Sequence, residues 1–114
     1  MAQLSTHVLD TARGIPAAGV LVEVRLVGQE PLATATTNAQ GRTETPLISR
    51  DRLELGVYEL TFHLGDYFRR NGVMLSDPPF LDRVVIRVGV ADPAGQYHIP
   101  LLVSPYGYTT YRGS

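Results

Sequence analysis

The sequence predicts an all-β fold, an antiparallel β-sandwich of about eight short strands in two sheets with one short helix. Two observations support this prediction. Apolar residues recur at every second position in several runs, which is typical of strands with one buried face. Glycine, proline, asparagine and aspartate gather between those runs, as expected for turns that reverse the chain.

The first half of the chain contains four of the expected strands. The clearest is Val20–Val27, where Val20, Val22, Val24 and Leu26 share one face and mostly polar residues occupy the other. Shorter alternating segments predict strands at Leu4–Leu9, Leu32–Thr37 and Arg42–Thr45. Turn residues at Gly28–Pro31 and Asn38–Gly41 separate these segments.

The second half adds four strands and the helix. Tyr58, Leu60 and Phe62 alternate with polar residues and predict a strand over Tyr58–His63. The same period predicts strands at Val84–Gly89 and Tyr97–Leu102, with a shorter one at Tyr108–Arg112. A short helix is expected over Gly65–Asn71, because Gly72 follows as a stop signal. Turns at Asp77–Pro79 and Asp92–Gly95 divide the remaining segments.

Pro100 is unusual in this pattern because it falls inside an expected strand. A proline has no backbone N–H and removes one hydrogen bond from a sheet, so it is found at edges, at bulges or beside cavities. It lies two residues from His98 and therefore on the same face of the strand. Two interpretations stay open, a structural edge and a strand face that lines a pocket.

Length and composition indicate one soluble globular domain spanning residues 1–114. The chain has 44% apolar and 18% charged residues and a net charge of -1, so neither nucleic acid nor an anionic membrane is an expected partner. The first residues lack the charged and apolar regions of a signal peptide. No apolar run approaches the roughly 18 residues of a membrane span. A cytoplasmic location is expected.

Two missing residue types narrow the chemistry. The chain has no cysteine, which excludes disulfides, thiolate nucleophiles and cysteine-ligated metals. All ten basic residues are arginine, which excludes Schiff-base lysines and lysine general bases. Any catalysis must therefore use histidine, carboxylates, hydroxyl groups or an activated water.

The chain has only three histidines, and two of them lie where a site could form. His7 and His98 fall on the non-core faces of their strands, whereas His63 is expected on the surface. Taken singly, such histidines are more often solvated or structural than catalytic. Together with an arginine, two imidazoles could activate water and bind a planar substrate. Spacing alone does not show that these residues converge, and no spacing typical of a metal site is present.

Nearly the whole chain resembles one known family, the transthyretin-like 5-hydroxyisourate hydrolases. The opening Leu4–Thr11 and the following Gly14–Ala17 resemble the family's first strand and turn. Thr37–Arg42 resembles its polar turn, which ends in Gly-Arg. The most specific segment is the ending, Tyr97–Leu102 followed by Ser104–Ser114, which closes on Tyr-Arg-Gly-Ser. Gly56–Leu60 and the Tyr67-Phe68 helix segment match the middle of the family pattern.

This resemblance implies a transthyretin-like sandwich that hydrolyses 5-hydroxyisourate to 2-oxo-4-hydroxy-4-carboxy-5-ureidoimidazoline without a cofactor. It implies a homotetramer, a dimer of dimers, with sites at the dimer–dimer interface. The expected catalytic residues are His7, Arg42 and His98, with the histidines activating water and the arginine orienting the substrate ring. The expected substrate-binding residues are those of the closing motif: Tyr111, Arg112, Gly113 and Ser114.

Two non-enzymatic alternatives remain at this point. The first is a small-molecule or thyroid-hormone carrier with the transthyretin fold, since vertebrate transthyretin shares the Ser-Pro-Tyr-x-Tyr stretch found at Ser104–Tyr108. The resemblance disfavours it, because transthyretin lacks the two histidines, the arginine and the closing motif. The second is an immunoglobulin-like adhesion module without a shared histidine-lined channel.

Overall fold

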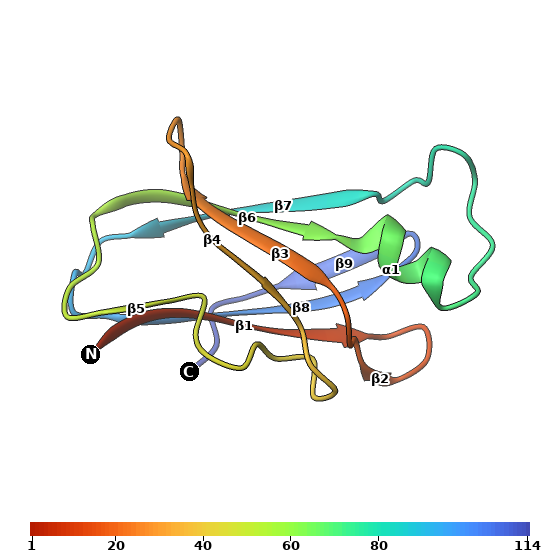
Figure 1. Ribbon diagram of the computed structural model, residues 1–114, viewed down its shortest axis with the longest axis horizontal. Coiled ribbons are helices and arrows are strands. Elements are labelled where there is room, and N and C mark those ends of the chain that lie inside the picture. The colour runs from red at the N-terminus through yellow and green to blue at the C-terminus, as the bar shows by residue number, and fades with distance from the viewer.

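The protein is a sandwich of two β-sheets with one short helix (Figure 1), as seen in a computed structural model that describes residues 1–114. One sheet has the order β2-β1-β8-β9, with β5 also paired to β1, and the other has the order β4-β3-β6-β7. The elements are β1 (Ala2–Asp10), β2 (Ile15–Pro16), β3 (Leu21–Leu26), β4 (Pro31–Thr36), β5 (Ile48–Arg50), β6 (Gly56–His63), α1 (Leu64–Arg70), β7 (Arg83–Val90), β8 (Gln96–Ser104) and β9 (Gly107–Thr110). No helix has the length and apolar character that a membrane crossing requires.

The predicted fold class is confirmed, and most expected elements are present within a few residues of their predicted bounds. The prediction of a strand at Arg42–Thr45 is wrong, because only Arg42 forms a single bridge there, to His7. Local side-chain bonding explains the difference, since the Thr43 hydroxyl donates to the Thr45 carbonyl and bends the segment. The two short strands β2 and β5 were not predicted, and they pair with opposite ends of β1 on the side that does not face β8.

The pairing of β1 with β8 is the only parallel one in the sandwich. Its register sets Leu4 opposite Tyr97, Ser5 opposite His98 and His7 opposite Pro100. Parallel neighbours require a long connection, and here most of the chain, including the whole second sheet, lies between the two strands. The first strand is therefore placed beside the last long strand.

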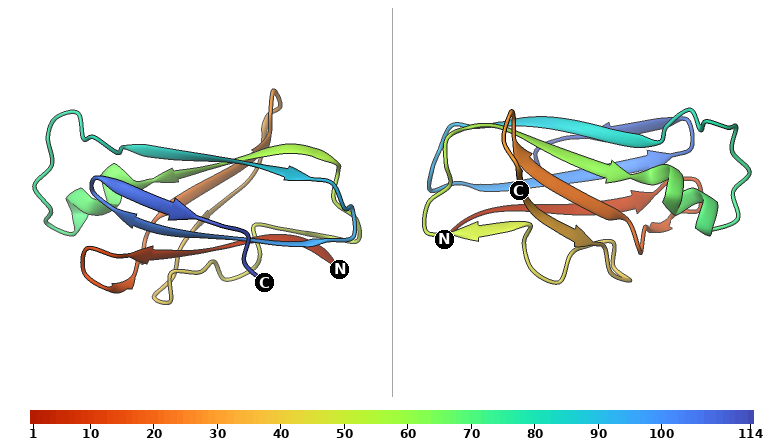
Figure 2. Two further views of the ribbon diagram at one scale, coloured as in Figure 1. Left: turned by 180° about the vertical axis from the view of Figure 1, so that it is seen from behind. Right: turned by 45° about the horizontal axis from the view of Figure 1, so that its top comes forward.

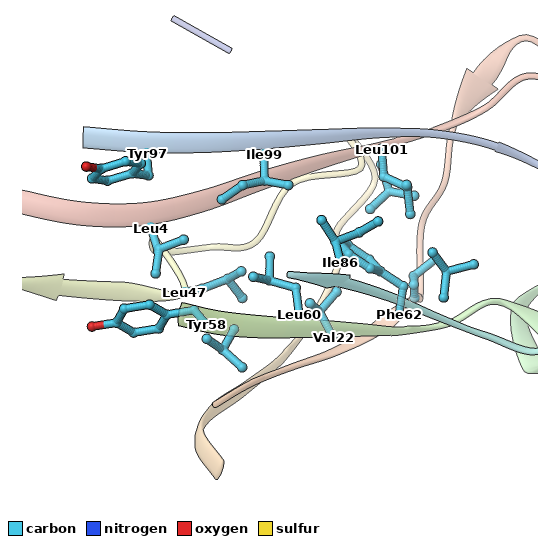
Figure 3. Close-up of a cluster of buried hydrophobic side chains, with 14 of the residues drawn as sticks. Leu4, Val22, Leu47, Tyr58, Leu60, Phe62, Ile86, Tyr97, Ile99 and Leu101 are labelled. Atoms are coloured by element: carbon cyan, nitrogen blue, oxygen red, sulfur yellow. The ribbon is translucent and has the colours of Figure 1, made fainter. Parts of the chain in front are cut away.

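The space between the sheets is filled by one cluster of buried apolar side chains (Figure 3). In β1 the alternation buries Leu4 and Val8 and leaves the residues between them on the outer face. Side chains of β8 such as Ile99 meet those of β6 such as Leu60 across the layer. Each fully buried side chain of this size contributes about 1.5–3 kcal/mol. This core fixes which faces of β1 and β8 point outward.

Pro100 is buried in an interior strand of its sheet, but it lies where the pairing of β8 with β9 has ended. The β8–β9 register pairs Leu101 with Thr110 and would next place Tyr111 opposite Pro100. The Pro100 carbonyl faces that side, because it accepts a hydrogen bond from the Thr110 hydroxyl (2.8 Å). The missing N–H therefore falls where Tyr111 would pair, and β9 ends at Thr110.

A buried carboxylate joins the end of β1 to the helix. Asp10 is 1% exposed and accepts hydrogen bonds from the hydroxyl of Tyr67 (2.8 Å) and from the backbone and guanidinium of Arg13 (3.1 and 3.2 Å). Burial by itself raises the pKa of Asp10, but the hydrogen bonds from Tyr67 and Arg13 outweigh it and lower the pKa. The charged form is thus the stable one in the folded protein.

We expect Asp10→Ala to lower the free energy of unfolding by about 2–4 kcal/mol, because it leaves the buried hydroxyl of Tyr67 without its acceptor. Urea denaturation followed by circular dichroism measures this change. Since the folded pKa of Asp10 is lowered, its contribution is complete above the ordinary value of 3.8 and is lost as the pH falls through the folded pKa.

The matched control is Asp66→Ala, which removes an exposed carboxylate that is also bonded to an arginine three residues away, Arg69. This control should leave stability nearly unchanged. Equal effects of the two substitutions would contradict the role given to the buried network.

Candidate active site

The outer face of the β1–β8 pair carries the two histidines that the sequence singled out. Ser5 and His7 alternate with the buried residues of β1, and His98 alternates with Tyr97 and Ile99 of β8. All three outer side chains are half-buried. The prediction that both histidines lie on non-core faces is confirmed, and the parallel register places them on neighbouring strands.

His98 is held in an environment that keeps its imidazole neutral. Its Nδ1 lies 2.8 Å from the Ser5 hydroxyl oxygen, directly across the strand pair. Burial lowers the pKa of His98, and the nearby positive charge of Arg42 and the ring of His7 lower it further. A neutral imidazole at pH 7 can accept a proton from water.

Arg42 reaches this face because a tight turn docks on β1. The Asn38 side-chain oxygen accepts hydrogen bonds from the backbone N–H groups of Gln40 (3.0 Å) and Arg42 (3.2 Å). Gly41, directly before Arg42, has a φ of 76°, and its carbonyl accepts from the N–H of Val8 (2.8 Å). A Cβ on Gly41 would lie 2.3 Å from the Val8 carbonyl oxygen, so only glycine permits this approach.

His7 is fixed by the same turn. Its Nε2 lies 2.9 Å from the backbone carbonyl of Gln40, which can only accept, so Nε2 carries the proton. In the neutral ring, Nδ1 is then the acceptor. His7 also forms the single backbone bridge to Arg42. The turn therefore orients the ring of His7 and also places Arg42 beside β1.

A polar pocket of about 290 Å³ opens on this face. Arg42 and His98 both line it, and six of its seven residues are polar. A second hollow of about 220 Å³ adjoins it and shares Gln3, Ser5 and Arg42. The lining residues of the first pocket are Gln3, Ser5, Arg42, Gln96, Tyr97, His98 and Ser114.

Two residues of the closing motif contact this pocket. Figure 2 shows the chain after β9 continuing across the β1–β8 layer, in the half of the sandwich that holds the N-terminus. There the N–H of Gly113 donates to the carbonyl of His98 (2.8 Å), and Ser114 lines the pocket. A Cβ on Gly113 would lie 2.6 Å from Cδ2 of His98, so the glycine lets the backbone lie against the imidazole.

The other two residues of the motif lie outside the polar pocket. The guanidinium of Arg112 stacks over the ring of Tyr97 at 4.3 Å from its centroid. Tyr111 is 58% exposed and lines a separate cleft beside Ile86 and Val88 of β7. In one chain, then, the structure brings Gly113 and Ser114 to His98 but does not bring Tyr111 or Arg112 there.

His63 differs from its predicted surface location. It lies on the outer face of the other sheet, but its side chain is only 11% exposed and its Nε2 lies 2.5 Å from an Oε1 of Glu23. The covering residue comes from the neighbouring strand β3, which period-two reasoning on a single strand does not reveal. His63 is therefore a bonded, structural histidine outside the pocket.

Sequence reasoning missed Ser5, Gln3 and Gln96 as parts of the site. A signal was present, because Gln3 and Ser5 share a face with His7, and Gln96 shares one with His98. The Gln40 carbonyl was also missed, and no pattern could have indicated it, since it belongs to the backbone.

Comparison with known proteins shows the same fold in relatives of two kinds. A 5-hydroxyisourate hydrolase of Deinococcus radiodurans is 55% identical, over 97% of this chain and 95% of its own. The solved 5-hydroxyisourate hydrolase of Klebsiella pneumoniae covers all of both chains with a TM-score of 0.85 and 38% identity. Transthyretin from Sparus aurata matches with a TM-score of 0.84 and 30% identity, over 96% of this chain and 95% of its own. A model of the HIUase/Transthyretin family matches residues 4–113, and the chain belongs to that family.

Proposed function

We propose that this protein hydrolyses 5-hydroxyisourate to 2-oxo-4-hydroxy-4-carboxy-5-ureidoimidazoline in the degradation of urate. The observation that carries the proposal is the polar pocket in which a neutral His98 lies near Arg42. The relatives named 5-hydroxyisourate hydrolase support it at 55% and 38% identity over nearly the whole chain.

In the proposed mechanism His98 is the general base. It takes a proton from a water molecule, whose oxygen adds to a ring carbonyl carbon of the substrate. The carbon–nitrogen bond of the ring amide then breaks, and the departing nitrogen takes the proton back from the imidazolium. The lowered pKa of His98 supports this role, because the ring is neutral and ready to accept when substrate arrives.

Arg42 and His7 complete the proposed catalytic set. The guanidinium offers only donors, so it can orient a planar, oxygen-rich ring and stabilise the charge that develops on the attacked carbonyl oxygen. His7 has Nε2 bonded to the Gln40 carbonyl, so its Nδ1 is the atom available to water or substrate. Ser114 supplies a polar wall to the same pocket.

We further propose that the pocket is completed in a homotetramer, a dimer of dimers with the sites at the dimer–dimer interface. The half-buried histidines lie on the outer face of a sheet, where a second copy could cover them. Tyr111 and Arg112, which do not reach His98 in their own chain, would then be free to contact substrate in the assembled site. A cytoplasmic location stays a prediction.

A carrier function is the second candidate, because transthyretin has the same fold. The lining of the pocket disfavours it. A carrier site for a drug-sized ligand is predominantly apolar, whereas here Tyr97 is the single hydrophobic residue among seven.

Substitutions at the catalytic set should abolish most turnover without unfolding the protein. We expect His98→Ala to lower kcat by about 10²–10⁴-fold and Arg42→Ala by about 10²–10³-fold. The assay follows the ultraviolet absorbance of freshly generated 5-hydroxyisourate with each variant. His63→Ala is the control, since it removes a histidine of the other sheet and should retain turnover.

Near-normal rates in both His98→Ala and Arg42→Ala would rule out the mechanism. Stoichiometric ligand binding by the unmodified protein, with no faster decay of 5-hydroxyisourate, would instead favour the carrier.

The pH dependence of kcat/KM should report the lowered pKa of His98. Because the protonated ring cannot act as a base, the acid limb should have its midpoint below 6.5, the ordinary histidine value. Arg42→Gln removes a positive charge that disfavours the imidazolium, so it should move the midpoint to higher pH. The control Arg69→Gln changes an exposed helix residue and should leave the midpoint in place. A midpoint above 6.5, or one unmoved by Arg42→Gln, would argue against His98 as the base.

The contact between Gly113 and His98 should also be needed for turnover. Gly113→Ala forces a methyl group against the imidazole, and the resulting misplacement should lower kcat by about tenfold or more. Gly107→Ala is the matched control, because a Cβ there meets its nearest atom at 3.8 Å. The measurements are kcat from the same assay and the melting temperature of each variant. If both alanine variants keep full turnover, the tail does not shape the site.

A further inference from the structure

We infer that Ser5 is a positioning residue that selects the tautomer of His98. Its hydroxyl oxygen accepts the Nδ1 proton of the neutral ring and so leaves Nε2 as the free acceptor. The tautomer assignment rests on the Ser5–His98 contact and on the donors of Arg42 in the same pocket. Its consequence for turnover rests on the proposed function, in which Nε2 receives the proton from water.

The placement of Ser5 is set by the sheet. Ser5 and His98 are opposite each other in the parallel ladder of β1 and β8, and both point to the outer face. The Ser5 oxygen and His98 Nδ1 are 2.8 Å apart, a good hydrogen-bond length. The Ser5 side chain has no other hydrogen-bond partner within the chain.

A serine hydroxyl can donate or accept, and the surroundings of the ring favour accepting. Arg42 shares the pocket with His98 and offers only donors. A ring with its proton on Nε2 would present another donor to a pocket that already holds Arg42, whereas a ring with its proton on Nδ1 presents a lone pair. The second form is compatible with both Ser5 and Arg42.

The orientation of the ring has separate support. The backbone of Gly113 lies against the Cδ2 edge of the ring and donates to the His98 carbonyl. Packing therefore limits how the imidazole can rotate, while the Ser5 hydroxyl decides where its proton resides. A substitution that removes only this hydroxyl should change the tautomer and leave the fold in place.

The two histidines then hold opposite tautomers. His7 has its proton on Nε2, because its partner is the Gln40 carbonyl. His98 has its proton on Nδ1, because Ser5 accepts there while Arg42 adds only donors to the shared pocket. His7 therefore offers Nδ1 as its acceptor, and His98 offers Nε2. The two lone pairs lie on different nitrogens of the imidazole ring.

Nitrogen-15 NMR of the full-length protein tests the tautomer without any assay of turnover. At a pH where His98 is neutral, its Nδ1 should show the shift of a protonated nitrogen and its Nε2 that of an unprotonated one. Ser5→Ala should move His98 towards the Nε2-protonated form, while Ser5→Thr, which keeps the hydroxyl, should retain the original form. Ser49→Ala removes an exposed strand serine and serves as the control. An Nε2-protonated His98 in the unmodified protein, or one indifferent to Ser5→Ala, would overturn the inference.

Kinetics test the consequence for turnover. Ser5→Ala should lower kcat by about tenfold or more with little change in KM, since a histidine in the wrong tautomer cannot act as the base. Ser5→Thr should restore most of the rate. If NMR shows the expected tautomer and its dependence on Ser5 but the unmodified protein does not hydrolyse 5-hydroxyisourate, the inference holds and the proposed function fails. If the unmodified protein is active and Ser5→Ala matches it in kcat, Ser5 has no positioning role in turnover.

Discussion

The site depends first on the parallel pairing of β1 with β8. This pairing sets Ser5 opposite His98 and His7 opposite Pro100, so two segments from opposite ends of the chain share one polar face. The buried faces of the same strands pack into the core, which fixes their outer faces in turn. A slip of one strand by one residue in this register would reverse its faces and send its histidine into the sandwich. The pairing of β1 with β8 therefore determines both the packing of the core and the positions of the site residues.

Two further segments close on this strand pair, and each does so at a glycine. Gly41 lies against the Val8 carbonyl, and Gly113 lies against the His98 ring. In both cases a Cβ would collide, and in both cases the next residue, Arg42 or Ser114, lines the pocket. The glycine permits a close backbone approach, and its neighbour uses that approach to place a polar group. Gly41-Arg42 and Gly113-Ser114 thus work in the same way: a glycine allows close contact, and the polar residue after it lines the pocket.

Local periodicity was enough to predict the longer strands and the outward faces of His7 and His98, because alternation is a property of a single strand. Periodicity could not show which strands pair with one another. The cover that Glu23 provides for His63 and the parallel pairing of β1 with β8 both arise from residues distant in sequence. The convergence of Arg42 on His98 likewise depends on a turn docked through backbone atoms. The resemblance to a family supplied the site residues that spacing left open.

Pro100 explains why the closing motif divides into two halves. Without a proline, the β8–β9 register would continue, and Tyr111 would pair with residue 100 as an ordinary rung. The ladder instead stops at Thr110 and resumes only at Gly113, which donates to the His98 carbonyl. Tyr111 and Arg112 are thereby released from pairing and make their contacts through side chains, while Gly113 and Ser114 return to the pocket. A proline usually weakens a strand. Pro100 instead separates Gly113 and Ser114, which lie at His98, from Tyr111 and Arg112, which are left free to contact a neighbouring subunit.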